Sequence, residues 1–411
     1  MIVKPRIRGF ICTTAHPTGC AAHVQEQIKY VAAQGTAPAN GFKNVLVLGS
    51  SGGYGLASRI VAGFGYQANT LGISFEKAPA ENKTASAGWY NNLAFEAAAK
   101  AAGVYARTLD GDAFSDAMRD QAAEVIRQDM GQIDLVVYSL ASPVRQHPHT
   151  GELHRSSIKP LGEVLDIKTV HVEKGEVSEV SLEPATQEES ANTVAVMGGE
   201  DWELWMQMLK EQDLLAPGAQ TVAYTYIGSE LTWPIYWEGT LGLAKADLDR
   251  ASRAISDNLA DIGGSARVAV LKAIVSQASS AIPVVPLYVA LLFKVMKEQG
   301  IHEDCISHIY RLFSTQLVPG IEQRLDDQGR IRVDDQELSD AVQGAVKQRW
   351  PQVTTENLPQ LGDLEGFRED FLRIFGFGIA GVDYDAEVDP EHFARLRRDT
   401  IGVAPSLLAG S

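Results

Sequence analysis

The chain is predicted to be an α/β protein built on a doubly wound parallel sheet. Three observations lead to this prediction. Short runs of β-forming apolar residues alternate with helical patterns in the first third of the chain, the first run ends in a glycine-rich turn that opens a helix, and an acidic residue ends the second run. Strands that alternate with helices form a parallel sheet covered on both faces. A glycine turn followed by an acid is typical of a dinucleotide-binding fold.

The glycine-rich turn follows the apolar run 45–48, which has the composition of a buried strand. Its glycines, Gly49, Gly53 and Gly55, are spaced G-x3-G-x-G. Glycine lets backbone N–H groups approach a diphosphate closely, and the N-terminus of the next helix favours the negative charge. Glu76 ends the second strand, 21 positions after Gly55, where such folds place an acid against ribose hydroxyls.

Two other interpretations of this turn are open. The segment 49–53 also spells G-x-S-x-G, the nucleophile elbow of α/β-hydrolases, with Ser51 as the nucleophile. An elbow usually follows several strands, whereas only 44 residues precede this strand, and a hydrolase explains neither the third glycine nor Glu76. The second alternative is a tight turn without a ligand. We favour the cofactor loop.

The remaining elements of the first part follow from periodicity and end signals. A helix is expected where Val24, Ile28 and Val31 share one face, another ends at Gly103, and a third begins after Ser115, a residue suited to capping. The expected order is a strand at 7–13, a helix at 21–34, strands at 45–48 and 71–76, a helix at 89–102, a strand at 104–109, a helix at 115–130 and a strand at 133–138.

After residue 141 the alternation breaks, and we expect a partly inserted, substrate-side segment at 142–218. Residues 1–285 are predicted to form the dinucleotide-binding and catalytic core, and 286–411 a mainly helical extension packed on it as one compact unit. The expected elements are a hairpin at 169–182 turning at Lys174-Gly175, a helix at 201–215, a strand at 221–227, a helix at 239–259, a strand at 267–274, helices at 287–299, 303–316, 336–349 and 364–375, and a small hairpin arm at 330–333.

Composition excludes several classes of protein. The net charge of -16 leaves no basic surplus for a general nucleic-acid binder. Three cysteines are too few for a disulfide framework, and Cys12, His16 and Cys20 match no familiar zinc pattern, so no metal is expected. Neither a signal peptide nor an apolar run of membrane-spanning length is present. We therefore expect a cytoplasmic protein with no membrane partner.

Tyr236 and Lys245 are the candidate catalytic pair. Short-chain dehydrogenases use a tyrosine as the acid, with a nearby lysine that stabilises the phenolate and binds ribose hydroxyls. Nine steps of about 100° place the two on opposite sides of an ideal helix. Tyr236 is therefore expected before the helix or across a distortion near Gly239. The alternative is a packed tyrosine and a solvated lysine.

The combination of these motifs resembles the FabV-type trans-2-enoyl reductases, enlarged relatives of the short-chain dehydrogenases. The resemblance covers the whole chain. It is carried by the opening decapeptide, the glycine turn with Phe75-Glu76, the Tyr236-x8-Lys245 pair and the segment 275–283. It implies that Tyr236 is the proton donor, that Lys245 is a cofactor and oxyanion-site residue, and that Tyr226 contacts the thioester carbonyl. It also implies a cofactor site formed by Gly49, Ser50, Ser51, Gly52, Gly53, Tyr54, Phe75, Glu76, Asp112, Ala113, Leu140, Ala141, Ile274, Val275 and Ser276.

The resemblance implies NADH-dependent reduction of the 2,3 double bond of an enoyl thioester, carried on acyl carrier protein or coenzyme A, by a monomer in fatty acid biosynthesis. Ala244 stands where some members carry a second lysine, so this chain has no pair of adjacent lysines at that place. A flavin-binding C-terminal region is sometimes ascribed to this family, but the residues here give it no independent support. The alternatives are a carbonyl-reducing short-chain dehydrogenase and a non-catalytic dinucleotide-binding sensor.

A basic island is needed to dock an anionic carrier on a chain of this net charge, because attraction is screened beyond about 8–10 Å. The loop after the strand at 133–138 is one candidate, since ligands bind at the carboxyl ends of parallel strands. Its cationic residues are Arg145, Arg155, Lys159 and Lys168. The alternative is a solvated loop without a partner.

Overall fold

The computed structural model describes residues 1–9, 11–35, 41–390, 392, 393 and 395. At its centre lies a seven-stranded sheet in the order β13-β12-β11-β6-β3-β4-β5. Every neighbouring pair is parallel, which confirms the predicted doubly wound parallel sheet. The strands are β3 (Asn44–Leu48), β4 (Asn69–Ser74), β5 (Ala106–Asp110), β6 (Ile133–Tyr138), β11 (Leu215–Thr225), β12 (Ser265–Val270) and β13 (Ile331–Arg332).

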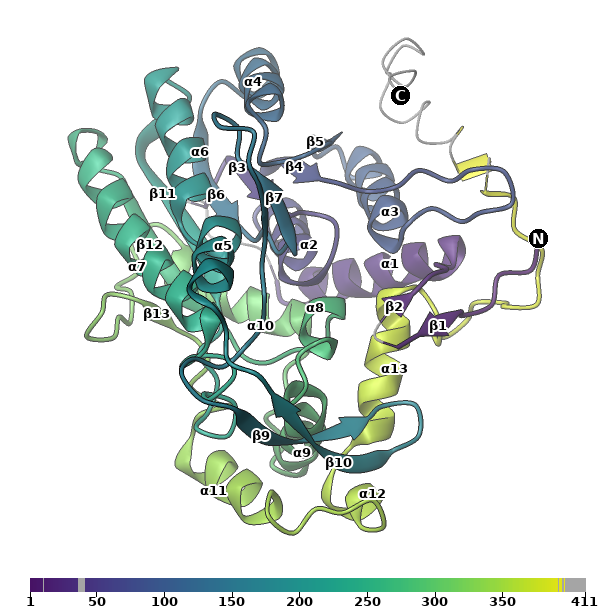
Figure 1. Cartoon of the computed structure of the whole chain (residues 1–411). Helices are drawn as coiled ribbons and strands as arrows, with labels where there is room; N and C mark the ends of the chain where they lie inside the picture. Colours follow the sequence, from purple (N-terminus) through teal and green to yellow (C-terminus); the bar gives the residue numbers. More distant parts are fainter. Residues whose placement is uncertain (10, 36–40, 391, 394, 396–411) are drawn as a thin grey trace.

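Both faces of this sheet are covered by helices, as Figure 1 shows. Leu46 and Leu48 pack into one core cluster, while Val45 and Val47 pack into the other. Successive side chains of a strand point to opposite faces, so a strand buried on both must be apolar throughout. The first cluster includes α4 (Asp116–Val125), α6 (Glu200–Glu211) and α7 (Thr240–Asn258), and the second includes α1 (Pro17–Ala33), α2 (Gly53–Ile60), α3 (Ala87–Ala101) and α10 (Cys305–Leu312).

The strand order reverses between β3 and β6. β3 pairs with β4 on one side and with β6 on the other. The residues that follow these two strands, Gly49 and Ser139, are therefore brought together at the carboxyl edge. Open α/β sheets bind their ligands at this switch point. The fold thus places the glycine-rich turn at the position expected for a ligand site.

A second group of elements packs at the carboxyl ends of β11 and β12. Ala273, which follows β12, and Tyr226, which follows β11, belong to its apolar cluster. In Figure 1 this group lies below the sheet. It consists of the hairpin β9 (Leu165–His171) and β10 (Glu176–Leu182), with α9 (Val285–Glu298), α11 (Asp340–Arg349), α12 (Leu358–Leu361) and α13 (Leu364–Ile374). The hairpin turns at residues 172–175, which confirms its predicted position.

Several predicted elements differ from the structure. The small hairpin arm expected at 330–333 is present as an antiparallel bridge between Leu325 and Ile331. It was not predicted that Ile331 also pairs in parallel with Ala269, which makes β13 the edge of the central sheet. The helix expected at 201–215 ends at Glu211, since Asp213 adopts a φ of 56° and Leu215 starts β11. Sequence analysis did not predict β7 (Val144–Gln146), β8 (Leu153–Arg155), α5 (Gln187–Met197) or α8 (Gln277–Ser280).

The expected strand at 7–13 is instead a short antiparallel hairpin, β1 (Ile7–Arg8) and β2 (Ile11–Cys12). It turns at Gly9, whose φ of 59° is unfavourable for residues with a side chain. Phe10, together with residues 396–411 of the predicted extension, lies outside the described residues.

None of the helices in the described part of the chain combines the length and hydropathy needed to cross a membrane. Within the same residues, no three His, Cys, Asp or Glu side chains are arranged to hold a metal ion. His16 instead caps α1, because its Nδ1 accepts a hydrogen bond of 3.1 Å from the Gly19 N–H.

Candidate active site

The glycine-rich turn joins β3 to α2 and is closely packed on its protein side. Gly49 has a φ of 83°, and a Cβ there would lie 2.2 Å from the Ser139 carbonyl oxygen. A Cβ on Gly55 would lie 1.9 Å from the Gly49 carbonyl oxygen. A Cβ on Gly52 or Gly53, by contrast, would have no neighbour within 4 Å. The turn is therefore open only on its outer side, where a diphosphate could approach the start of α2.

Glu76 lies beside this turn. Its Oε1 accepts a hydrogen bond of 2.5 Å from Ser51 Oγ, and its Oε2 accepts one from Ser86 Oγ. Gly88 allows this arrangement, because a Cβ there would lie 2.1 Å from Glu76 Oε1. Asn91 Nδ2 also donates to the Ser51 carbonyl oxygen at 3.0 Å. Since the Ser51 hydroxyl donates to a carboxylate, and no described histidine bonds to it, the geometry does not support the nucleophile elbow.

Sequence analysis missed Ser86, Gly88 and Asn91, which hold Glu76 and the glycine turn in place. The three belong to the cap and first turns of α3. The available signal was the position of α3, which begins soon after the predicted acid. Their spacing matches no motif that sequence analysis singled out.

Other predicted cofactor residues also lie at the carboxyl edge of the sheet. Phe75 follows β4 with 80% of its surface exposed, so its ring is free to stack on a flat ligand. Leu140 follows β6, and its Cδ2 would lie 3.3 Å from a Cβ on Gly49. Asp112 and Ala113 follow β5, but Ala113 is buried and its carbonyl oxygen accepts a bond of 3.0 Å from Trp205 Nε1. The predicted roles of these residues stay predictions.

Tyr54 connects the turn to the end of β12. Its hydroxyl donates a hydrogen bond of 2.8 Å to the Lys272 carbonyl oxygen. The segment that continues from Lys272 contains Ile274, Val275 and Ser276, and Ser276 caps α8 by accepting from the Ser279 N–H at 3.0 Å. The predicted diphosphate and nicotinamide segments are thus joined by a direct contact.

Tyr226 and Tyr236 lie together. Tyr226 follows β11 and Tyr236 lies in the turn before α7, and their ring centroids are 5.1 Å apart with an interplanar angle of 80°. Because α7 begins at Thr240, the prediction that Tyr236 precedes the helix is confirmed. Burial raises the pKa of both phenols, so each carries its proton near neutrality.

Lys245 lies in the second turn of α7 and is partly buried. Among the described residues, its ammonium has no hydrogen-bond or ion-pair partner. Burial lowers its pKa to about 8, and Asp249 one turn later opposes this shift. A desolvated cation without a protein partner is suited to binding a polar or anionic ligand.

A buried carboxyl group, Glu337, lies against Tyr226 and was not predicted. Its Oε1 is 3.0 Å from the Tyr226 hydroxyl and 2.8 Å from the Tyr288 hydroxyl. Its Oε2 accepts from the Ala273 N–H at 2.6 Å. Sequence analysis treated 336–349 as an ordinary helix, whereas α11 begins only at Asp340 and Glu337 belongs to the preceding turn.

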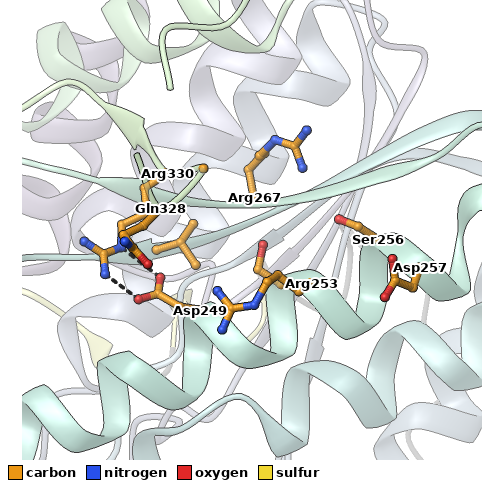
Figure 2. Close-up of a pocket in the computed structure, with 10 residues that line it drawn as sticks. Asp249, Arg253, Ser256, Asp257, Arg267, Gln328 and Arg330 are labelled. Carbon is orange, nitrogen blue, oxygen red and sulfur yellow. Dashed lines mark hydrogen bonds and ion pairs between the residues drawn. The ribbon is translucent and has the colours of Figure 1, made fainter. Parts of the chain in front are cut away.

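One cavity of about 250 Å³ lies elsewhere, along α7 beside β12 and the loop before β13. Figure 2 shows that Asp249 and Arg330 face each other there, with hydrogen bonds of 2.9 and 2.6 Å from the guanidinium to the carboxylate. None of the predicted site residues lines this cavity. Because none of those residues lines it, this cavity is not the candidate active site.

The predicted basic docking loop is wrong at Arg145. This side chain is 1% exposed, and its guanidinium donates at 2.7 Å both to Glu200 and to the Ala195 carbonyl oxygen. Lys159 pairs with Glu189 at 2.6 Å, and Lys168 donates to the Trp350 carbonyl oxygen at 3.1 Å. These three cations are engaged with the protein, whereas Arg155, the fourth residue of the predicted set, is exposed. The four therefore do not form one free basic surface.

The family models that match the chain together span most of its length. They are the trans-2-enoyl-CoA reductase catalytic region (residues 83–318), the NAD(P)H binding domain of trans-2-enoyl-CoA reductase (residues 2–81) and the enoyl reductase FAD binding domain (residues 325–388). Within the last of these regions, the segment 333–339 between β13 and α11 contains no glycine and carries three carboxyl groups, so this segment offers no cradle for a flavin diphosphate.

Known proteins match over nearly the whole chain. An enoyl-[acyl-carrier-protein] reductase [NADH] of Tolumonas auensis is 59% identical over 95% of this chain and 98% of its own length. Its counterpart in Edwardsiella ictaluri is 57% identical with the same coverage. The crystal structure of Treponema denticola trans-2-enoyl-CoA reductase in complex with NAD superposes with a TM-score of 0.91, at 50% identity, over 94% of this chain and 98% of that one.

Proposed function

The chain belongs to the trans-2-enoyl reductase family, and on that premise we propose that Tyr226, Tyr236 and Lys245 form the active centre of an NADH-dependent enoyl reductase. The enzyme reduces the 2,3 double bond of an enoyl thioester. The observation that supports this site best is the contact of two protonated tyrosines at the carboxyl edge of the sheet. They are close in sequence to Lys245, which has no hydrogen-bond or ion-pair partner in the described part of the chain. The glycine turn and Glu76 supply the cofactor end.

The residues of the chain fit the dinucleotide. The turn 49–55 is open on its outer side, Phe75 is exposed, and Lys245 is unpaired among the described side chains. When bound, NADH supplies a hydride to the β-carbon of the substrate. Gly49, Ser50, Ser51, Gly52, Gly53 and Tyr54 would hold the diphosphate, Phe75, Glu76, Asp112 and Ala113 the adenosine, and Leu140, Ala141, Ile274, Val275 and Ser276 the nicotinamide end.

Tyr226 and Tyr236 have different roles toward the substrate. Tyr226 donates a hydrogen bond to the thioester oxygen, where negative charge develops as the enolate forms, so the bond strengthens in the transition state. Tyr236 supplies the proton for the α-carbon. Lys245 binds the ribose and places positive charge near the phenol. Leu231, Ile158 and Val275, partly buried apolar residues of the same cluster, would adjoin the acyl chain.

Lys245 predicts how NADH binding depends on pH. Its pKa is lowered to about 8, so the ammonium is present below that pH and is lost as the pH rises through it. We expect the Kd for NADH of the free enzyme to rise between about pH 7 and pH 9. Nicotinamide fluorescence titrations across this range would measure the change.

The control for this prediction is a lysine engaged elsewhere. Lys245→Met should bind NADH weakly with little pH dependence and should also turn over slowly. Lys210→Met, which removes a lysine paired with Asp261 at 2.8 Å on α6, should keep the wild-type curve. A wild-type curve in Lys245→Met would exclude Lys245 from the cofactor site.

Glu76 predicts a preference for NADH over NADPH. Two serines hold its carboxylate beside the glycine turn, where a 2′-phosphate would meet it. Two like charges about 4 Å apart near a protein surface repel by up to about 4 kcal/mol, and salt reduces this. We expect kcat/KM to favour NADH by about 10²-fold, measured as the loss of NADH or NADPH absorbance with crotonyl and dodecenoyl thioesters.

The variant Glu76→Gln should lower the ratio of kcat/KM for NADH to that for NADPH, because it removes the negative charge beside the 2′-phosphate. Lys77→Ala is the matched control, because Lys77 is the exposed neighbour of Glu76. If its ammonium points to solvent, this variant should keep the wild-type preference, whereas a stronger preference for NADH would show that Lys77 admits the phosphate. Equal efficiencies with both cofactors in the wild type would remove Glu76 from its role. Absence of turnover on every enoyl thioester, despite NADH binding, would favour a sensor, and oxidation of alcohols with NAD would favour a carbonyl reductase.

We further propose that the protein acts in fatty acid biosynthesis as a cytoplasmic monomer, with substrates carried on acyl carrier protein or coenzyme A. We also propose that residues 286–411 form one compact unit with the core, 1–285, in which 142–218 is the substrate-side segment. Within the described residues, α10 packs in the same apolar cluster as β3, and β13 extends the central sheet.

A further inference from the structure

Glu337 lies where three parts of the fold meet behind Tyr226. Its side chain is completely buried. It receives a hydrogen bond from the backbone at the end of β12 and contacts one tyrosine after β11 and another on α9. The active centre proposed above assigns it no role. Carboxyl groups are rarely buried unless they are paired or perform a task.

The surrounding hydrogen bonds determine where the protons lie. Gln343 Nε2 donates to the Tyr288 hydroxyl at 3.1 Å and to the Glu337 carbonyl oxygen at 2.7 Å, so its amide orientation is set. Tyr288 accepts that bond and directs its own proton to Glu337 Oε1. The Ala273 N–H occupies Oε2. The contact between Oε1 and the Tyr226 hydroxyl is the one whose direction remains free.

That direction decides what Tyr226 can offer to a substrate. A carboxylate only accepts hydrogen bonds, so an ionised Glu337 would accept the hydrogen bond that the Tyr226 hydroxyl can donate. The Tyr226 oxygen would then present only lone pairs to the thioester oxygen. A protonated Glu337 would donate to the Tyr226 oxygen instead. The Tyr226 proton is then free to point at the oxygen on which the enolate charge develops.

The environment of Glu337 favours the protonated form. No cation lies within 4.0 Å of its carboxyl group among the described residues. Lys272, also buried, donates to the Ala273 carbonyl oxygen at 2.8 Å and lies 4.7 Å from the centroid of the Phe293 ring. Burial raises the pKa of Glu337, and the charge of Lys272, the Ala273 N–H and the two tyrosines oppose this. Burial lowers the pKa of Lys272, and the charges of Glu337, Glu303, Cys305 and Asp304 oppose this shift.

We propose that Glu337 is a positioning residue of the reductase, which in its protonated form donates to Tyr226 and turns the Tyr226 hydroxyl proton toward the thioester oxygen. The inference rests on the proposed function, in which Tyr226 faces that oxygen. Glu337 transfers no proton to the substrate. It selects the direction of a hydrogen bond, and the interaction with the enolate depends on that direction.

Two substitutions at Glu337 test this role. Glu337→Gln keeps the shape, and its amide N–H₂ can donate to Tyr226 at every pH, so kcat should stay close to wild type. Glu337→Leu removes the donor and leaves the Tyr226 hydroxyl undirected, so kcat should fall, but by less than the about 10²-fold loss expected for Tyr226→Phe, which lacks the oxyanion donor altogether. Neither should change the Kd for NADH, which also reports that the variants are folded.

The pH profile of kcat distinguishes positioning from a structural role. At saturating NADH and crotonyl thioester, the wild-type kcat should fall as Glu337 ionises with rising pH, and Glu337→Gln should lack that limb. Any limb that Glu337→Gln retains belongs to other groups such as Lys245. Tyr288→Phe is the matched control, because it removes a hydrogen bond to the same oxygen without touching Tyr226. It should keep the limb but move it to higher pH, because the hydrogen bond that it removes lowers the pKa of Glu337.

The outcomes separate this inference from the proposed function. If Tyr226→Phe turns over like the wild type, the role of Tyr226 itself fails. If Tyr226→Phe is slow but Glu337→Leu is normal, or if Glu337→Gln is as slow as Glu337→Leu, the positioning role of Glu337 is overturned. Adding Glu337→Leu to Tyr226→Phe should cause no further loss of kcat, because the two act through one hydrogen bond.

Discussion

Tyr236→Phe is expected to lower kcat by about 10² to 10⁴-fold, the usual contribution of a general acid, while NADH binds as in the wild type. The substitution is clean. Phenylalanine keeps the ring that packs against Tyr226 at 5.1 Å, and no described residue forms a hydrogen bond with the Tyr236 hydroxyl. Its removal therefore leaves no buried partner unsatisfied. Single-turnover reduction of a crotonyl thioester, with NADH affinity measured in parallel, would separate chemistry from binding.

Tyr224→Phe provides a control for Tyr236→Phe. Tyr224 lies on β11, two residues before Tyr226, and its hydroxyl is 2.6 Å from Ser58 Oγ, away from the proposed centre. Losing this buried hydrogen bond should cost about 1 kcal/mol of stability and leave kcat nearly unchanged. Turnover of Tyr236→Phe within about twofold of wild type would be far less than a general acid contributes and would refute the assignment.

Much of the sheet could be predicted because its strands carry local signals. Val45 to Leu48 are fully buried between two helical layers, so the strand is apolar throughout and its ends are marked by glycine and polar residues. β13 is only two residues long, and its partner β12 lies about 60 residues earlier in the chain. Its residues indicated only a small local hairpin arm, so its place in the central sheet follows from tertiary packing and not from a local signal.

The two ends of the site differ in the same way. The glycine turn and Glu76 were predictable because a short strand-turn-helix-strand unit fixes their spacing. The spacing of Tyr236 and Lys245 alone was weak evidence for a catalytic pair, and the family resemblance strengthened that prediction. Glu337 lies 111 residues from Tyr226, and a lone acid before a helix gives no signal. Arg145 counted as a surface cation, but its partner Glu200 lies 55 residues away.

Gly55→Ala is expected to destabilise the protein and to weaken NADH binding strongly. The new Cβ would lie 1.9 Å from the Gly49 carbonyl oxygen and 2.9 Å from its carbon, and neither backbone atom can rotate away. Overpacking of this kind typically costs about 1–3 kcal/mol, and sometimes more. Relief requires the turn to move, and about 1.4 kcal/mol of lost cofactor affinity corresponds to a tenfold higher Kd. Urea unfolding and NADH titration would measure the two effects.

Gly52→Ala separates the two effects because the same added methyl group meets a different neighbour. Gly52 has a φ of −158°, which any residue adopts, and a Cβ there has no protein atom within 4 Å. The urea midpoint should therefore match the wild type. The methyl group would project from the open side of the turn, where the diphosphate is proposed to lie, so the Kd for NADH should still rise. A Gly52→Ala variant that binds NADH normally would move the diphosphate away from this turn, whereas a normal urea midpoint for Gly55→Ala would contradict the close packing of Gly55 on Gly49.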